Sequence, residues 1–128
     1  MGYISPLMAV RGVQNTIDFY KDTLGFEAGL IVPTEEGIEY ADVSKDGMVL
    51  MFVPVENVGL SGKEKLGTGV NLYLEIDGDL DEYYTQLKDK GVTVVEDIKD
   101  EPFGIRDFTI ADNNGYHITF VKPIQGNG

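Results

Sequence analysis

The chain has 128 residues, 42% hydrophobic and 25% charged, which is enough apolar material for one compact globular body. Asp and Glu number 22 against 10 Lys and Arg, for a formal net charge of −12. This balance argues against a nucleic-acid partner, because binding the phosphate backbone needs clustered cationic side chains. The sequence has no cysteine, which excludes disulfides, thiol nucleophiles and thiolate metal sites.

The sequence also predicts a cytoplasmic protein with no membrane partner. No apolar run approaches the ~20 residues that a membrane-spanning helix needs. The N-terminal sequence MGYISPLMAV has no basic region of the kind that begins a secretion signal.

The first half of the chain predicts one helix among four strands. A strand over residues 3–10 precedes the helix, and further strands are expected at 26–32, 38–43 and 48–53, separated by glycine-containing turns. The apolar positions of the helix recur at the spacing of a single buried face. These positions are Val13, Ile17, Tyr20 and Leu24, with Gly25 where a left-handed C-terminal cap belongs.

The second half repeats this order after a polar, glycine-rich linker. The helix there has Leu80, Tyr84 and Leu87 on one face and Gly91 at its end. Its strands are expected at residues 70–76, 92–98, 103–111 and 116–122. Each half is therefore predicted to be a β-α-β-β-β module. We expect one α+β domain over 1–128, with module one at about 1–55, a linker at about 56–69 and module two at about 70–122.

Two stretches carry a family resemblance, VRGVQNTIDFYKDTLGFE and FGIRDFTIADNNGYHITFV. They resemble the vicinal oxygen chelate superfamily, which includes glyoxalase I, extradiol dioxygenases and bleomycin-resistance proteins. The resemblance implies that the sheets of the two modules curl into a cup around a ligand. It is closest to the metal-free bleomycin-resistance-like members, which implies a homodimer.

Metal-using members of the superfamily place four ligands in the cup. Carried over by position, the resemblance puts these at Ser5, at Leu50 or Met51, at Asn71 and at Thr119. None of these side chains is a carboxylate or an imidazole, the donors that divalent ions in such a site require. We therefore expect no metal and no other cofactor.

The only histidine, His117, lies in the alternating strand sequence GYHITFV. It shares a predicted face with Thr119, opposite Ile118. The alternatives are a hydrogen-bonded residue at the rim and a polar contact to a ligand, since a neutral imidazole both donates and accepts. No Ser-His-Asp arrangement can be recognised around it.

The strand NLYLEID also has two distinct faces. Leu72, Leu74 and Ile76 are expected to meet the helix, so that the intervening polar and aromatic residues line the cup. Aromatic rings with a few polar groups are the usual lining of a small-molecule pocket. The candidate ligand-binding residues are Asn71, Tyr73, Glu75, His117, Thr119, Tyr40, Phe52, Phe103, Arg106 and Phe108.

Together these observations favour a metal-independent small-molecule binding protein over an enzyme. Its ligand is expected to be cationic or aromatic, because the protein is acidic and the proposed lining is rich in tyrosine and phenylalanine. Sequestration of an antibiotic or a toxic metabolite would fit. A lyase or isomerase of the glyoxalase-like class with an atypical or absent metal site is the alternative, and an interaction module whose cup has closed is a third.

Overall fold

The computed structural model describes residues 2–124, and it divides into two compact units, Met1–Leu66 and Gly67–Gly128. Each unit contains four strands in one sheet and one main helix, in the order β-α-β-β-β that the sequence predicts. In the described part of the chain, neither helix is long and apolar enough to cross a membrane.

The N-terminal unit is built on a mixed sheet with the strand order β1-β4-β3-β2. β1 runs parallel to β4, and the other neighbours are antiparallel. The strands are β1 (Leu7–Val10), β2 (Glu27–Thr34), β3 (Gly37–Lys45) and β4 (Met48–Pro54). Parallel pairing of the first and last strands requires a crossover, and the chain makes it through the helix and the hairpins.

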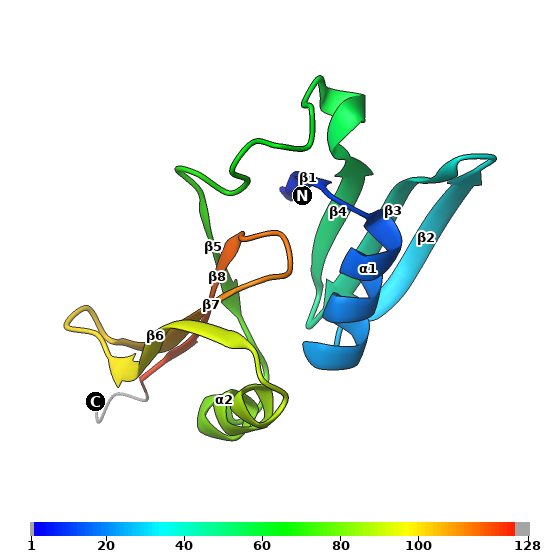
Figure 1. Cartoon of the computed structure of the whole chain (residues 1–128). Coiled ribbons are helices and arrows are strands. Elements are labelled where there is room, and N and C mark those ends of the chain that lie inside the picture. The colour runs from blue at the N-terminus through cyan, green and yellow to red at the C-terminus, as the bar shows by residue number, and fades with distance from the viewer. Residues whose placement is uncertain (1, 125–128) are drawn as a thin grey trace. The chain divides into compact units, whose positions relative to one another are not determined.

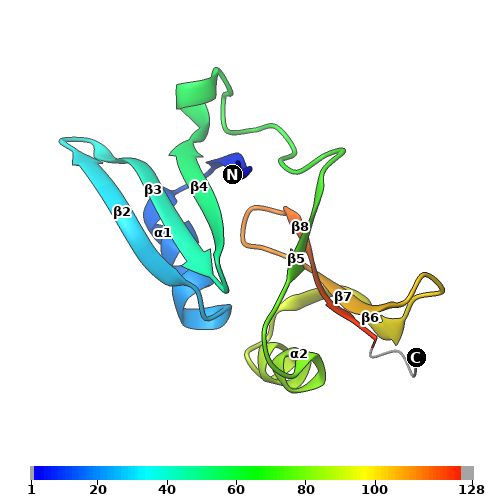
Figure 2. The same ribbon diagram turned by 180° about the vertical axis from the view of Figure 1, so that it is seen from behind.

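One helix covers a single face of this first sheet, as the two opposite views in Figures 1 and 2 show. It begins as α1 (Val13–Asp18) and continues as a wider π-helical turn, η1 (Phe19–Thr23). The predicted apolar positions are all buried there: Val13, Ile17, Tyr20 and Leu24. Gly25 follows with φ +80°, the left-handed conformation expected of a residue that ends a helix.

The C-terminal unit has the equivalent sheet order, β5-β8-β7-β6. Its strands are β5 (Asn71–Glu75), β6 (Thr93–Asp100), β7 (Ile105–Ala111) and β8 (His117–Pro123). α2 (Leu80–Asp89) begins at Asp79, whose carboxylate caps it by accepting from the backbone N–H of Glu82 at 3.1 Å. Its buried residues are the predicted Leu80, Tyr84 and Leu87.

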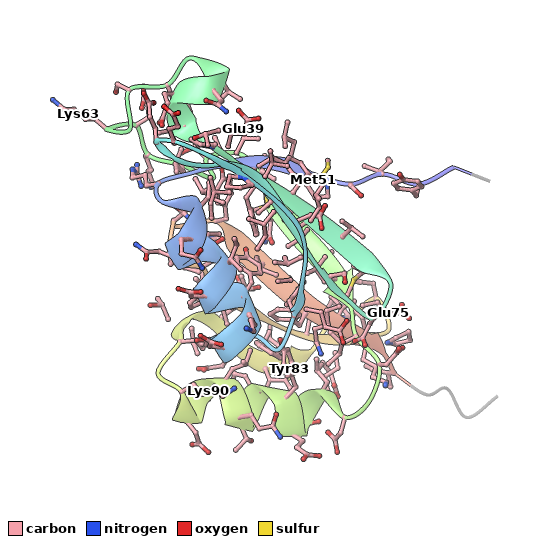
Figure 3. All side chains as sticks on the ribbon, turned by 90° about the vertical axis from the view of Figure 1, so that its right-hand side faces the viewer. Glu39, Met51, Lys63, Glu75, Tyr83 and Lys90 are labelled. Carbon is pink, nitrogen blue, oxygen red and sulfur yellow. The ribbon has the colours of Figure 1, made fainter. Side chains whose placement is uncertain are left out.

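Aromatic rings fill the space between α2 and the second sheet. Tyr83 lies on the sheet side of α2 (Figure 3), with its ring centroid 5.1 Å from that of Phe120. The ring of Tyr84 lies 4.8 Å from that of Phe108. This cluster fixes which face of the sheet the helix covers, and therefore which face it leaves uncovered.

The first strand starts later than the sequence predicts. It begins at Leu7, whereas the apolar sequence favoured a start at residue 3. Pro6 has no N–H to donate, so it contributes to the ladder only as an acceptor, from the N–H of Met51 at 3.0 Å. Tyr3 and Ile4 before it are 88% and 95% exposed.

The segment after β4 is more ordered than its composition suggests. It opens with a 3₁₀ turn, η2 (Val55–Val58). Arg11, just before α1, then donates to the carbonyl oxygens of Gly62 and Glu64. The Glu64 carboxylate accepts from the backbone N–H of Ser61, and these backbone hydrogen bonds hold its pKa down at about 2. The segment is thus tied back to its own unit.

Candidate functional site

The second sheet has a face turned away from α2, which we call its helix-free face. Leu74, Ile118 and Phe120 point to the opposite side and are buried in the core under α2. Side chains alternate along a strand, and residues paired across neighbouring strands point to the same side of the sheet. The register therefore identifies which residues of β5, β8 and β7 lie on the helix-free face, in rows of three directly paired residues. The rows are Asn71–His117–Ala111, Tyr73–Thr119–Thr109 and Glu75–Val121–Asp107.

Five of the sequence-predicted site residues share this face: Asn71, Tyr73, Glu75, His117 and Thr119. The register places them on the side of the sheet opposite Leu74, as the strand alternation predicts. That they contact a ligand stays a prediction. Tyr73 is 57% exposed, whereas Thr119, on a central strand, is 1% exposed. On this face the edge strand β5 supplies exposed groups, and His117 at the start of β8 is exposed as well, whereas Thr119 further along β8 is buried.

A short chain of hydrogen bonds crosses the helix-free face. The hydroxyl of Thr119 lies 3.1 Å from the amide oxygen of Asn71, to which it donates, and 2.7 Å from the hydroxyl of Thr109. A hydroxyl has one proton, so if Thr119 gives its proton to Asn71 it must accept one from Thr109. Both threonines are buried, and the chain satisfies their hydroxyl groups without solvent.

The donor set at the superfamily's ligand positions does not fit a divalent metal. Asn71 and Thr119 offer an amide and a hydroxyl that already bond to each other, and Met51 offers a thioether. Met51 lies on the helix-free face of the first sheet, opposite Leu7 and Asp42, and on the side of β4 away from α1 (Figure 3). Across residues 2–124 no three His, Asp or Glu side chains come together as a possible metal site. The absence of a metal remains a prediction.

Asp107 is a member of the helix-free face that the sequence analysis missed. Its side chain lies in the row of Glu75 and is 2% exposed. Burial, together with hydrogen bonding to Glu101, raises its pKa to about 6. The sequence did contain a signal for this position. In the strand IRDFTIA, Phe108 and Ile110 point to one side, and Asp107, one residue before Phe108, must point to the other.

Two of the predicted site residues belong to the core instead. Phe52 and Phe108 are 0% exposed and face the helices. The ring of Phe52 lies 5.0 Å from that of Tyr20, and Phe108 packs against Tyr84. Their prediction as lining residues was wrong because each is in phase with the helix-facing residues of its strand, where an aromatic ring fills the core.

Arg106 and Phe103 also lie away from this face. Arg106 alternates with Asp107 and points to the other side of β7, where its guanidinium binds Asp81 at 2.8 Å and Asp100 at 2.9 Å. The hydrogen bond from Arg106 lowers the pKa of Asp81. Phe103 lies in the turn before β7 and is 66% exposed. Neither residue contributes to the helix-free face.

The remaining candidate, Tyr40, belongs to the first sheet. Its hydroxyl donates to Asp42 at 2.9 Å, and the other oxygen of Asp42 accepts from the N–H of Leu30 at 3.0 Å. Burial and the neighbouring carboxylate raise the pKa of Tyr40. A side chain on Gly29 would overlap Asp42, so glycine is what allows β2 to approach this carboxylate. Tyr40 and Asp42 thus form a polar pair that is fixed by the additional hydrogen bond from Leu30.

Each unit also has a cavity at a sheet end. One of about 470 Å³ lies between the start of α1 and the β2–β3 turn, lined in part by Arg11, Glu36 and Glu56. Another of about 470 Å³ lies beside the start of α2 and includes Arg106 and Ile124. The guanidinium of Arg106 is already bound by two carboxylates, so this second cavity offers a ligand little free donor capacity.

Comparison with known proteins identifies the family. The profile of the Glyoxalase/Bleomycin resistance protein/Dioxygenase superfamily matches residues 2–120. The chain belongs to this superfamily. No curated protein matches the sequence. The superfamily's fold of tandem β-α-β-β-β modules agrees with the two units described above.

Solved structures of the superfamily fold resemble this chain along most of its length. TioX from Micromonospora sp. ML1 is 19% identical with a TM-score of 0.75, covering 99% of this chain and 100% of its own. TnmS3 from Streptomyces sp. CB03234, an antibiotic binding protein, is 23% identical with a TM-score of 0.73, covering 96% and 97%. A superfamily member from Sphaerobacter thermophilus is 25% identical with a TM-score of 0.71, covering 94% and 97%.

Proposed function

We propose that the protein is a metal-independent binder of a small cationic or aromatic molecule, which contacts the helix-free face of the second sheet. The observation that carries this proposal is the composition of that face. An exposed tyrosine ring, a carboxylate and an imidazole come from neighbouring rows, at Tyr73, Glu75 and His117. The rows around them contain few apolar side chains, whereas a sheet face that packs in a core is mainly apolar.

Each side chain has a role suited to such a guest. The Tyr73 ring offers a surface on which a flat or cationic group can stack. Glu75 supplies the negative charge that attracts a cation, and His117 can donate to or accept from a polar substituent. The fold likeness to TnmS3, an antibiotic binding protein, is consistent with this role, and sequestration of such a compound is the corresponding biological function.

The hydrogen-bonded state of Asn71 and Thr119 favours binding over metal-assisted catalysis. By the resemblance, superfamily enzymes would extend metal ligands from these two positions, and here the Thr119 hydroxyl donates instead to the Asn71 amide oxygen. A lyase or isomerase reaction would need another electrophile to polarise its substrate, and the three rows described on the helix-free face contain neither a lysine nor an arginine for that purpose.

A ligand screen followed by matched variants tests the proposal. Cationic antibiotics and aromatic metabolites are screened by thermal shift, since a ligand selective for the native state raises the melting temperature. Affinity of the best compound is then compared in Glu75→Gln and in Asp89→Asn, which removes an equal charge from the exposed end of α2. Glu75→Gln should weaken binding by about 1–3 kcal/mol and Asp89→Asn by far less. Equal effects of the two variants would refute the proposed site.

A further inference from the structure

The side-chain amide of Asn71 is hydrogen-bonded through its oxygen and not through its nitrogen. Asn71 begins β5 and is exposed on the helix-free face, paired with His117. Its Oδ1 accepts from the buried hydroxyl of Thr119 at 3.1 Å, and no group of the described residues accepts from its Nδ2. The amide nitrogen carries two N–H donors, so Asn71 offers an approaching molecule donors rather than its engaged oxygen.

Two buried threonines fix this orientation of the amide. The hydroxyls of Thr119 and Thr109 lie 2.7 Å apart, and the two residues are 1% and 3% exposed. With the amide oxygen towards Thr119, Thr109 donates to Thr119 and Thr119 donates to Asn71, so each hydroxyl proton has an acceptor. With the amide turned round, one of these two protons would have no acceptor among the described residues. A buried donor without an acceptor is costly, which favours the orientation seen.

Asn71 lies at one end of the proposed binding residues on β5. Tyr73 and Glu75 follow it on the same face, at distances of roughly 7 and 13 Å along the strand by the usual rise per residue. A guest that lies along β5, with its charge at Glu75 and its ring against Tyr73, therefore brings its other end to the Asn71 amide. The net charge of −12 disfavours an anion there, so the complementary group is a neutral acceptor such as a carbonyl oxygen.

We propose that Asn71 is a specificity-determining residue, whose N–H donors select guests that carry a neutral hydrogen-bond acceptor at the end opposite their charge. This inference rests on the proposed function and adds the chemistry of the guest's second end. Thr119 is a positioning residue, because it holds the amide oxygen and thereby leaves the donors to the guest. Since the amide is already oriented, binding does not have to order it.

The orientation of the amide is tested first, without a ligand. In ¹⁵N-labelled protein, both side-chain N–H protons of Asn71 should exchange with water as fast as those of Asn15, which is also exposed. The hydroxyl proton of Thr119 should exchange slowly, because it is buried and hydrogen-bonded. If the amide were turned round, one N–H proton of Asn71 would bond to the buried Thr119. Protection of one Asn71 N–H proton from exchange overturns the inference.

Three aromatic amines of similar size test the selection. 4-Acetylphenethylamine carries a carbonyl acceptor, 4-isopropylphenethylamine has nearly the same shape without it, and 4-aminophenethylamine has a donor at that end. Affinity is measured from the shift changes of the helix-free face. The acetyl compound should bind about three- to tenfold more tightly than the isopropyl compound, as expected for one added hydrogen bond.

Variants are compared by the ratio of these affinities, so a general loss of binding cancels. Asn71→Asp replaces the donors by an acceptor and keeps the bond from Thr119. It should abolish the preference for the acetyl compound and favour the amino compound. Thr119→Val should reduce the acetyl preference, and Thr119→Ser, which retains a hydroxyl, should preserve it. Thr109→Val removes a hydroxyl from the same chain but leaves the bond to Asn71, so most of the preference should persist.

The outcomes separate the inference from the function on which it rests. If the acetyl and isopropyl compounds bind the helix-free face equally well, or if only other compounds of the thermal-shift screen bind it, the inference is overturned and the proposed function stands. If no compound binds this face, both fail. Equal losses of preference in Thr119→Val and Thr109→Val would overturn the positioning role. Should Thr119→Val not fold, Asn71→Asp on the exposed edge strand provides the test.

Discussion

The hydroxyl of Thr119 donates to the amide oxygen of Asn71 at 3.1 Å, joining β8 to β5 on the helix-free face of the second sheet. By the resemblance to the superfamily, these two positions are the ones at which metal-using members are expected to present ligands. Here they bond to each other, and the hydroxyl of Thr109 continues the chain at 2.7 Å. We interpret this hydrogen-bonded chain as structural: it links β5, β8 and β7 on the face that carries the exposed Tyr73 and Glu75.

The protein should purify without a stoichiometric metal. Neutral amide, hydroxyl and thioether groups bind zinc, nickel, manganese or iron weakly in the absence of a carboxylate or imidazole partner. Elemental analysis of untagged protein prepared without chelator should find far less than one equivalent of any of these metals per chain. About one tightly held equivalent would contradict the assignment of these positions as structural.

Two of the phenylalanines of the second unit, Phe108 and Phe103, should differ sharply in their effect on stability. Phe108 is fully buried between Tyr84 and Phe120, so Phe108→Ala should lower the free energy of unfolding by about 3–5 kcal/mol. Phe103 is 66% exposed, and Phe103→Ala should change it by about 0.5 kcal/mol or less. Denaturant unfolding measures both, and similar losses would show that the core is misassigned.

Gly29 and Asp42 should behave as a coupled pair. Gly29→Ala places a methyl group on the Asp42 carboxylate, and overpacking of this kind costs about 1–3 kcal/mol. Asp42→Ala loses the hydrogen bonds from Leu30 and Tyr40 but removes the obstacle. The double variant should therefore be no less stable than Asp42→Ala alone. Additive losses in a double-mutant cycle would mean that Gly29 is required for some other reason.

A homodimer is expected in solution. β1 and β5 each pair with a single neighbour, so each leaves one side of its backbone without a strand partner in its own unit, and Leu7 on β1 is 55% exposed. Exposed edges and apolar side chains of this kind are commonly covered by a second copy. Light scattering at micromolar concentration should give about twice the mass of the 14.1 kDa chain. A stable monomer at that concentration would contradict the expectation.

The sequence predicted the order of elements and the two faces of β5 well, because alternation and helical spacing are properties of local sequence. In NLYLEID, leucines at every second position identify the helix-facing side and leave Tyr73 and Glu75 on the other. The same rule, applied to VLMFV, would have placed Phe52 with Leu50 in the core. Phe52 was proposed as a binding residue because it is aromatic, although its position two residues after Leu50 indicated that it packs in the core.

Other features depend on residues distant in the sequence and could not be predicted. Asp107 acquires its raised pKa from burial and from Glu101, which reaches it across a turn. Arg11 holds the segment around Gly62, 51 positions away. Arg106 was predicted to face a ligand, but its partner Asp81 lies on a helix 25 positions earlier. Neither composition nor periodicity contains such long-range contacts.

Mapping a bound compound onto the backbone amides tests the central claim most directly. The best compound of the thermal-shift screen is titrated into ¹⁵N-labelled protein, and shift changes are compared between the two faces of the second sheet. The account predicts the largest changes at Tyr73, Glu75 and His117, their loss in Tyr73→Ala, and little change along α2. Changes centred on the cavity beside α2, around Arg106 and Leu80, with Tyr73→Ala binding normally, would contradict it.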